Sequence, residues 1–340
     1  LLKTTEGDIY RVNLIEKLLA TALAKLSNFI PEGGIWMNTQ RPEWNDANNA
    51  LVGNGVSMVT LCYLRRYLSF LELTISNMDL ETVQISKELK TFFDGIDETF
   101  KVNINLLEGK ISDLQRKKIL DGVGNAGSTY REVIYKHGFS NEKSNLDKDD
   151  LIAFLQLSLS YLDHTIDANK REDHLYHAYN LMSVENEVAV SISYLPEMLE
   201  GQVAVLSSGY INANQALNVM NALKNSALFR PDQYSYLLYP NTELARFTSK
   251  NRIPLTRFEN SELLQTLIQN GNREIIEMDA LGEVHFNGNF NNADSLKNAL
   301  DQISENSYEQ LIAKERDSIL ELFEEVFNHK AFTGRSGTFY

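Results

Sequence analysis

A six-residue segment near the start of the chain combines side chains that suit sugar chemistry. Arg41-Pro42-Glu43-Trp44-Asn45-Asp46 places two carboxyls around an indole and a carboxamide. An indole presents a flat face to a sugar ring, and a carboxyl against an aromatic ring can have its pKa raised enough to donate a proton near neutrality. The segment therefore predicts an acid site at a glycosidic bond. The structural alternative is a helix N-cap formed by Asn45 or Asp46.

Two later polar-aromatic stretches have the composition of sugar subsites. They are Tyr194–Gln202 and Arg230–Tyr236, and within them Glu200 and Gln233 are the candidates for contacts with sugar or with a nucleophilic water. Both stretches can equally cap helices. His174 and His177 have a spacing that can share a metal on a helix, but no third ligand is apparent, so we predict no metal site and no cofactor.

The elements that must position these residues are mostly helices. Apolar residues recur at helical spacing over 14–26, 56–75, 85–96, 151–159, 217–223 and 311–326, and Ser112 with Gln115 forms a capping box. Short extended pieces are expected at 188–194 and 275–286. We therefore predict a mainly α fold, namely an (α/α) toroid of helical hairpins with minor short strands. Residues 1–340 are predicted to form one catalytic region. Fewer helices are predicted than such a toroid needs, so the chain is expected to be incomplete. The alternative is a generic helical bundle.

The composition and net charge limit the class of protein and the kinds of partner it can bind. The chain has 340 residues, a 43% hydrophobic fraction and a formal charge of −14, which together favour a globular protein and disfavour nucleic acid. The single cysteine, Cys62, lies in an apolar run and is expected to be a buried thiol. No apolar stretch is long enough to cross a bilayer. We expect a soluble fragment of a longer polypeptide that acts with the rest of its chain. Its compartment, cytoplasmic or periplasmic, stays open.

The segment Trp44-Asn45-Asp46 resembles the Trp-Asn-Asp signature of the inverting glycoside phosphorylases of the cellobiose and chitobiose phosphorylase type, whose catalytic domain is an (α/α)6 barrel. The resemblance implies that Asp46 is the general acid. From their side-chain chemistry we expect Trp44, Asn45, Arg41 and Glu43 to contact the sugar. The resemblance also implies inorganic phosphate as co-substrate, held by Thr333-Gly334 and by His285, and Arg335 is expected to add positive charge to this anion site. The chain departs from the family pattern at Glu43, where an Asp is usual, and after Gly334, where a larger apolar pair is usual.

These observations predict an enzyme that cleaves a β-linked gluco-oligosaccharide with inversion, by phosphorolysis. One alternative is an inverting hydrolase, in which water replaces phosphate and Glu43 or Glu200 acts as the base. A second alternative is a noncatalytic carbohydrate-binding or scaffolding piece that keeps the loop as structure. The oligomeric state is not predicted.

Overall fold

The computed structural model describes residues 2–37, 53–241, 246–304 and 308–327. These residues form two compact units, Leu1–Asn241 and Thr242–Tyr340. This division describes how the residues pack. That residues 1–340 act as one catalytic region stays a prediction.

Long helices make up most of the first unit. They are α1 (Leu14–Leu26), α3 (Met58–Ser76), α4 (Lys87–Val102), α5 (Asp113–Lys136), α6 (Lys148–Ala168), α7 (Leu199–Ser207) and α8 (Ala213–Asn225), with a 3-10 turn η1 (Ile104–Glu108). Helix α3 packs against α6 and α4 against α5, around a core that includes Leu23, Leu61, Phe100 and Leu155. The predicted capping box of Ser112 and Gln115 is confirmed at the start of α5. Cys62 is buried, as predicted.

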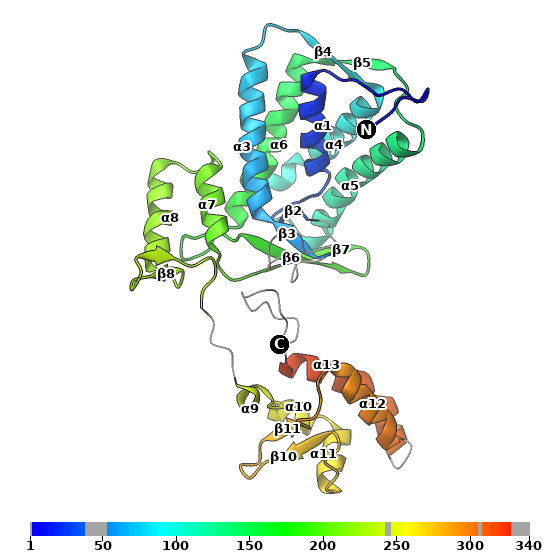
Figure 1. Cartoon of the computed structure of the whole chain (residues 1–340), viewed down its shortest axis with the longest axis vertical. Helices are drawn as coiled ribbons and strands as arrows, with labels where there is room; N and C mark the ends of the chain where they lie inside the picture. Colours follow the sequence, from blue (N-terminus) through cyan, green and yellow to red (C-terminus); the bar gives the residue numbers. More distant parts are fainter. Residues whose placement is uncertain (1, 38–52, 242–245, 305–307, 328–340) are drawn as a thin grey trace. The chain divides into compact units, whose positions relative to one another are not determined.

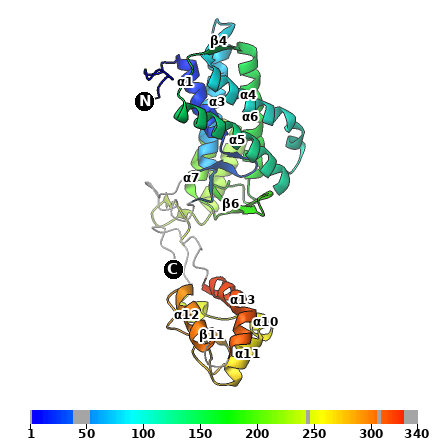
Figure 2. The same ribbon diagram turned by 90° about the vertical axis from the view of Figure 1, so that its right-hand side faces the viewer.

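A curled five-stranded antiparallel sheet lies across one end of these helices (Figures 1 and 2). Its order is β1 (Phe29–Ile30), β2 (Gly34–Trp36), β3 (Gly55–Ser57), β6 (Tyr179–Glu185) and β7 (Ala189–Tyr194). The pairing of Gly55 with Leu181 joins parts of the chain that are far apart in sequence. Val56, Met182 and Val190 pack together as a small second core beside the helical one.

This sheet makes the predicted mainly α toroid wrong. Three of the five strands have only two or three residues, too few to show the alternation of a strand, and their flanking glycines are typical of loops. The extended piece expected at 188–194 is confirmed as β7. Smaller two-stranded sheets pair β4 (Thr82–Ser86) with β5 (Lys143–Asp147), and β8 (Phe229–Arg230) with β9 (Ser235–Tyr236).

The second unit is a small α+β structure with its own core. Its helices are α9 (Phe247–Lys250), α10 (Leu255–Glu259), α11 (Glu262–Gln269), α12 (Ala293–Ile303) and α13 (Glu309–Phe327). They pack around a hairpin of β10 (Ile276–Met278) and β11 (Val284–Phe286), which confirms the extended piece expected at 275–286. Leu264, Phe286 and Phe323 are buried at its centre.

Candidate functional site

The sheet holds both ends of the segment that carries the predicted acid. Residues 38–52 connect β2 to β3, and these two strands pair through Ile35 with Ser57 and Trp36 with Val56. Two further bonds close the connection: the Trp36 indole Nε1 donates to Gly53 O at 3.0 Å and Met37 N donates to Gly55 O at 3.0 Å. The predicted site residues Arg41, Glu43, Trp44, Asn45 and Asp46 themselves lie outside the described residues.

A buried ion pair fixes the turn that precedes β2. Glu32 has a positive φ of 58°, which a non-glycine residue rarely adopts. Its carboxylate accepts from Arg116 Nη2 at 2.7 Å and from Ile111 N at 2.8 Å. The side chains of Glu32 and Arg116 are only 6% and 4% exposed, so water screens the pair little. Arg116 thereby ties α5 to the turn before β2.

Two carboxamide side chains also bind this turn. Asn169 Nδ2 donates to Glu32 O at 2.9 Å, and Asn180 Nδ2 donates to Gly33 O and to Asn169 Oδ1, both at 2.8 Å. Both Asn side chains belong to fully buried residues. We call Glu32, Arg116, Asn169 and Asn180 the turn cluster. It connects α5, α6 and β6 to the start of the strand that leads to residues 38–52.

Glu200 lies in the first turn of α7 and is bound to a buried phenol. Tyr179 Oη donates to Glu200 Oε2 at 2.7 Å, and burial, reinforced by this carboxylate, raises the pKa of Tyr179 far above its usual value. The next residue, Gly201, packs against the backbone of Ala178, where an added Cβ would lie 2.9 Å from Ala178 Cα. The helix start is therefore held against β6, which carries Tyr179. Sequence reasoning did not find Tyr179, because no local pattern links it to Glu200.

Gln233 lies in the exposed turn between β8 and β9. Its backbone N donates to Arg230 O at 3.3 Å, and the neighbouring Arg230 and Asp232 form an exposed ion pair at 2.5 Å. No hydrogen bond joins Gln233 to Glu200 in the part of the chain that the structure describes. Sugar contacts by Glu200 and Gln233 stay predictions.

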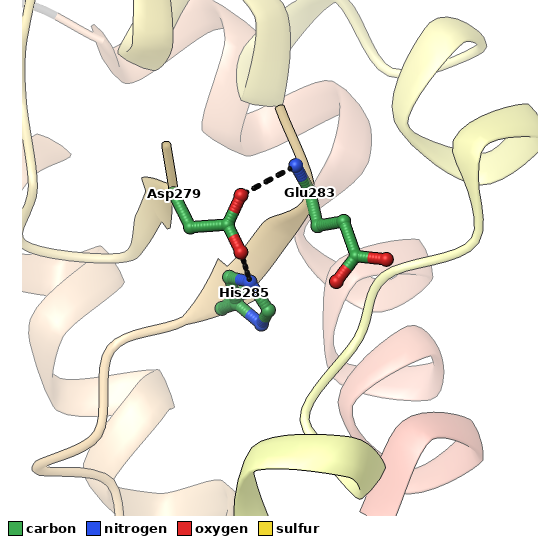
Figure 3. A group of neighbouring side chains, drawn as sticks. All are labelled: Asp279, Glu283 and His285. Carbon is green, nitrogen blue, oxygen red and sulfur yellow. Dashed lines mark hydrogen bonds and ion pairs between the residues drawn. The ribbon is translucent and has the colours of Figure 1, made fainter. Parts of the chain in front are cut away.

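His285 lies on β11 among acidic side chains (Figure 3). Its Nδ1 faces the backbone oxygen of Asn251 in a short contact, and its Nε2 lies 3.2 Å from Asp279 Oδ2. Glu283 is the third member of this group, and its carboxylate pairs with Arg252 at 2.9 Å. Two carboxylates disfavour an anion at this ring, so the surroundings give no support to the predicted phosphate contact. Thr333, Gly334 and Arg335 lie outside the described residues.

His174 and His177 do not join a metal-ligand group among the described residues. His174 is exposed with a φ of 68°, whereas His177 stacks on Tyr194 with its Nδ1 3.3 Å from Leu195 O. Burial, with the nearby Arg171 charge, lowers the pKa of His177. The two rings therefore have separate environments.

The second unit matches a known domain. Residues 244–330 match the family model described as GH149 phosphorylase insertion domain 2, which supports a relation between this chain and the glycoside phosphorylases and suggests a carbohydrate-active enzyme. The match covers residues 244–330 of the second unit, and it supports neither the cellobiose and chitobiose phosphorylase type nor a barrel domain. No curated protein matches the chain. Within the described residues, no helix is both long and apolar enough to span a bilayer.

Proposed function

We propose that this chain belongs to an enzyme that cleaves a β-linked gluco-oligosaccharide by phosphorolysis with inversion. The match of residues 244–330 to a phosphorylase insertion domain carries the proposal. The Trp44-Asn45-Asp46 segment adds independent support, because it lies in the other unit and resembles the acid motif of glycoside phosphorylases.

In the proposed reaction Asp46 donates a proton to the departing glycosidic oxygen while phosphate attacks the anomeric carbon from the opposite face. The carbon–oxygen bond to the leaving sugar breaks, a carbon–oxygen bond to phosphate forms, and the anomeric configuration inverts. Trp44 stacks on the sugar, and Asn45, Arg41 and Glu43 bind its hydroxyls. Thr333, Gly334 and Arg335 are the proposed phosphate ligands.

The sheet supports this arrangement through its register. Because β2 and β3 pair directly, the segment between them begins and ends at neighbouring positions, and the turn cluster holds the turn that precedes the first of these strands. Catalytic residues often lie on loops that a rigid scaffold positions. Firmly held flanking residues on both sides of segment 38–52 suit a general acid, because small displacements of a catalytic group lower the rate by large factors.

Asp46→Asn tests the acid, and Asp121→Asn is the matched control. We expect Asp46→Asn to lower kcat by about 10²–10⁴-fold, the usual contribution of general acid catalysis. Asp121 is half exposed on α5 and pairs with Lys117, so the same chemical change there should leave kcat unchanged. Wild-type activity in Asp46→Asn would remove Asp46 from the mechanism. Saccharide binding by the wild-type protein without any turnover would favour the noncatalytic binding role.

A further inference from the structure

We propose that Asp279, Glu283 and His285 form a Zn²⁺ site on the β10–β11 hairpin. One ligand atom from each side chain lies within 4.8 Å of the others, with no change of backbone (Figure 3). The inference is independent of the proposed function. The sequence alone predicts no metal here and assigns phosphate to His285.

The His285 ring is oriented from outside this group. Its Nδ1 faces the carbonyl oxygen of Asn251, and a carbonyl can only accept, so Nδ1 carries a proton. Asn251 is 4% exposed and is itself fixed, since its Nδ2 donates to Phe286 O at 2.7 Å and its Oδ1 accepts from Phe286 N at 2.9 Å. Histidines that bind metals commonly donate their other N–H to a backbone carbonyl in this way.

This orientation leaves Nε2 facing a carboxylate. Nε2 of the neutral ring is an acceptor, and Asp279 Oδ2, 3.2 Å away, is also an acceptor. Two acceptors at this distance repel unless a cation lies between them. A second ring proton would satisfy the contact, and so would a metal ion bound to both atoms.

The two carboxylates have the right atoms available. Asp279 Oδ1 accepts from Leu281 N at 2.8 Å and Glu283 N at 2.9 Å, so the turn uses one oxygen and leaves Oδ2 directed at the ring. Glu283 Oε1 pairs with Arg252, which leaves its second oxygen for a metal. These bonds fix Asp279 without occupying the oxygen that the metal would bind.

The donor set favours zinc over the harder cations. One imidazole nitrogen with two carboxylate oxygens suits Zn²⁺, whereas Mg²⁺ and Ca²⁺ prefer oxygen ligands alone. The side chains of His285, Asp279 and Glu283 are 19%, 35% and 36% exposed, so water can supply the fourth ligand. The Arg252 guanidinium opposes a second cation nearby and should weaken the affinity.

Calorimetric titration of the metal-stripped full chain with ZnCl₂ at pH 7.5 tests the site. We expect one Zn²⁺ per chain, and no saturable binding in the same titration with MgCl₂. His285→Asn and Asp279→Asn should each raise the Kd for Zn²⁺ at least ~10-fold, because each removes a ligand. Arg252→Gln should lower the Kd.

The variants are chosen to separate lost ligands from lost structure. In Asp279→Asn the amide oxygen can still accept both backbone N–H bonds of the turn. This variant therefore still tests the Zn²⁺ site if His285→Asn does not fold. His174→Asn is the control, since His174 is an exposed histidine beside Asp173 in the first unit, and Asn tolerates its positive φ. Its Kd should equal that of the wild type. Absence of one-to-one Zn²⁺ binding, or wild-type affinity in Asp279→Asn, overturns the proposal.

Discussion

The substitution Arg116→Met should lower the unfolding free energy of the first unit far more than substitution of any exposed residue on the same helix. The guanidinium makes five hydrogen bonds: Nε to Pro31 O, Nη1 to Val190 O and Asp113 Oδ1, and Nη2 to Ile111 O and Glu32 Oε2. Methionine fills similar space but donates none of them. The Glu32 carboxylate would then stay buried with Ile111 N as its remaining described donor.

The size of the effect follows from burial. Removing one partner of a buried ion pair costs about 3–5 kcal/mol, because the other charge remains uncompensated. Exposed pairs contribute about 0.3–0.5 kcal/mol. Lys136→Met supplies the comparison, since Lys136 pairs with Glu132 on the same helix at 65% and 60% exposure. We therefore expect Arg116→Met to lower the free energy of unfolding by about 3–5 kcal/mol, and Lys136→Met by less than about 0.5 kcal/mol.

Urea denaturation followed by tryptophan fluorescence isolates the relevant unit. Both tryptophans, Trp36 and Trp44, belong to the first unit, so the signal does not report unfolding of the second. The double variant Glu32→Gln with Arg116→Met should lose less stability than the two single variants predict together, because it leaves no unpaired buried charge; the other ionic partner, Asp113, is half exposed. A loss below about 1 kcal/mol in Arg116→Met would refute the argument, since that is the range of exposed pairs.

Three further predictions concern the same unit. Gly201→Ala should lower the free energy of unfolding by about 1–3 kcal/mol in the same urea assay, because the new Cβ meets the Ala178 backbone; unchanged stability would mean that α7 can shift freely. Burial raises the pKa of the Cys62 thiol to about 12, so at pH 8 a thiol reagent should modify the native protein at least ~100-fold more slowly than the urea-unfolded protein, and equal rates would contradict the burial. The pKa of His177 is lowered in the folded protein, so the unfolded state takes up this proton first as pH falls below about 6.5. Stability should therefore drop on acidification, and the drop should be smaller in His177→Phe. An NMR titration of the ring with a midpoint above the ordinary value would reverse the sign of this pH dependence.

The features that could be predicted from the sequence are those that depend on residues close together in the chain. The capping box of Ser112 and Gln115 depends on two residues three positions apart, and the helix predicted over 56–75 is observed as Met58–Ser76 because its apolar spacing is long and regular. The sheet depends on pairings such as Gly55 with Leu181, between segments more than a hundred positions apart, which periodicity cannot reveal.

The same distinction applies to the candidate sites. The family resemblance predicts a phosphate contact for His285, but its neighbours decide its chemistry, and Asp279 reaches the ring only because the hairpin folds back. The polar-aromatic context of Glu200 predicts a sugar contact, whereas its bond to Tyr179 depends on the docking of α7 against β6. Glu32 and Arg116 lie more than eighty positions apart, and no spacing rule joins them.

The most direct test of the proposed function is a ³¹P and ¹H NMR time course of β-linked gluco-oligosaccharide cleavage, with and without inorganic phosphate. Phosphorolysis with inversion predicts an α-configured sugar 1-phosphate that accumulates only when phosphate is present. Equal cleavage rates without phosphate, with free sugar as the product, would contradict the proposal and favour the inverting hydrolase.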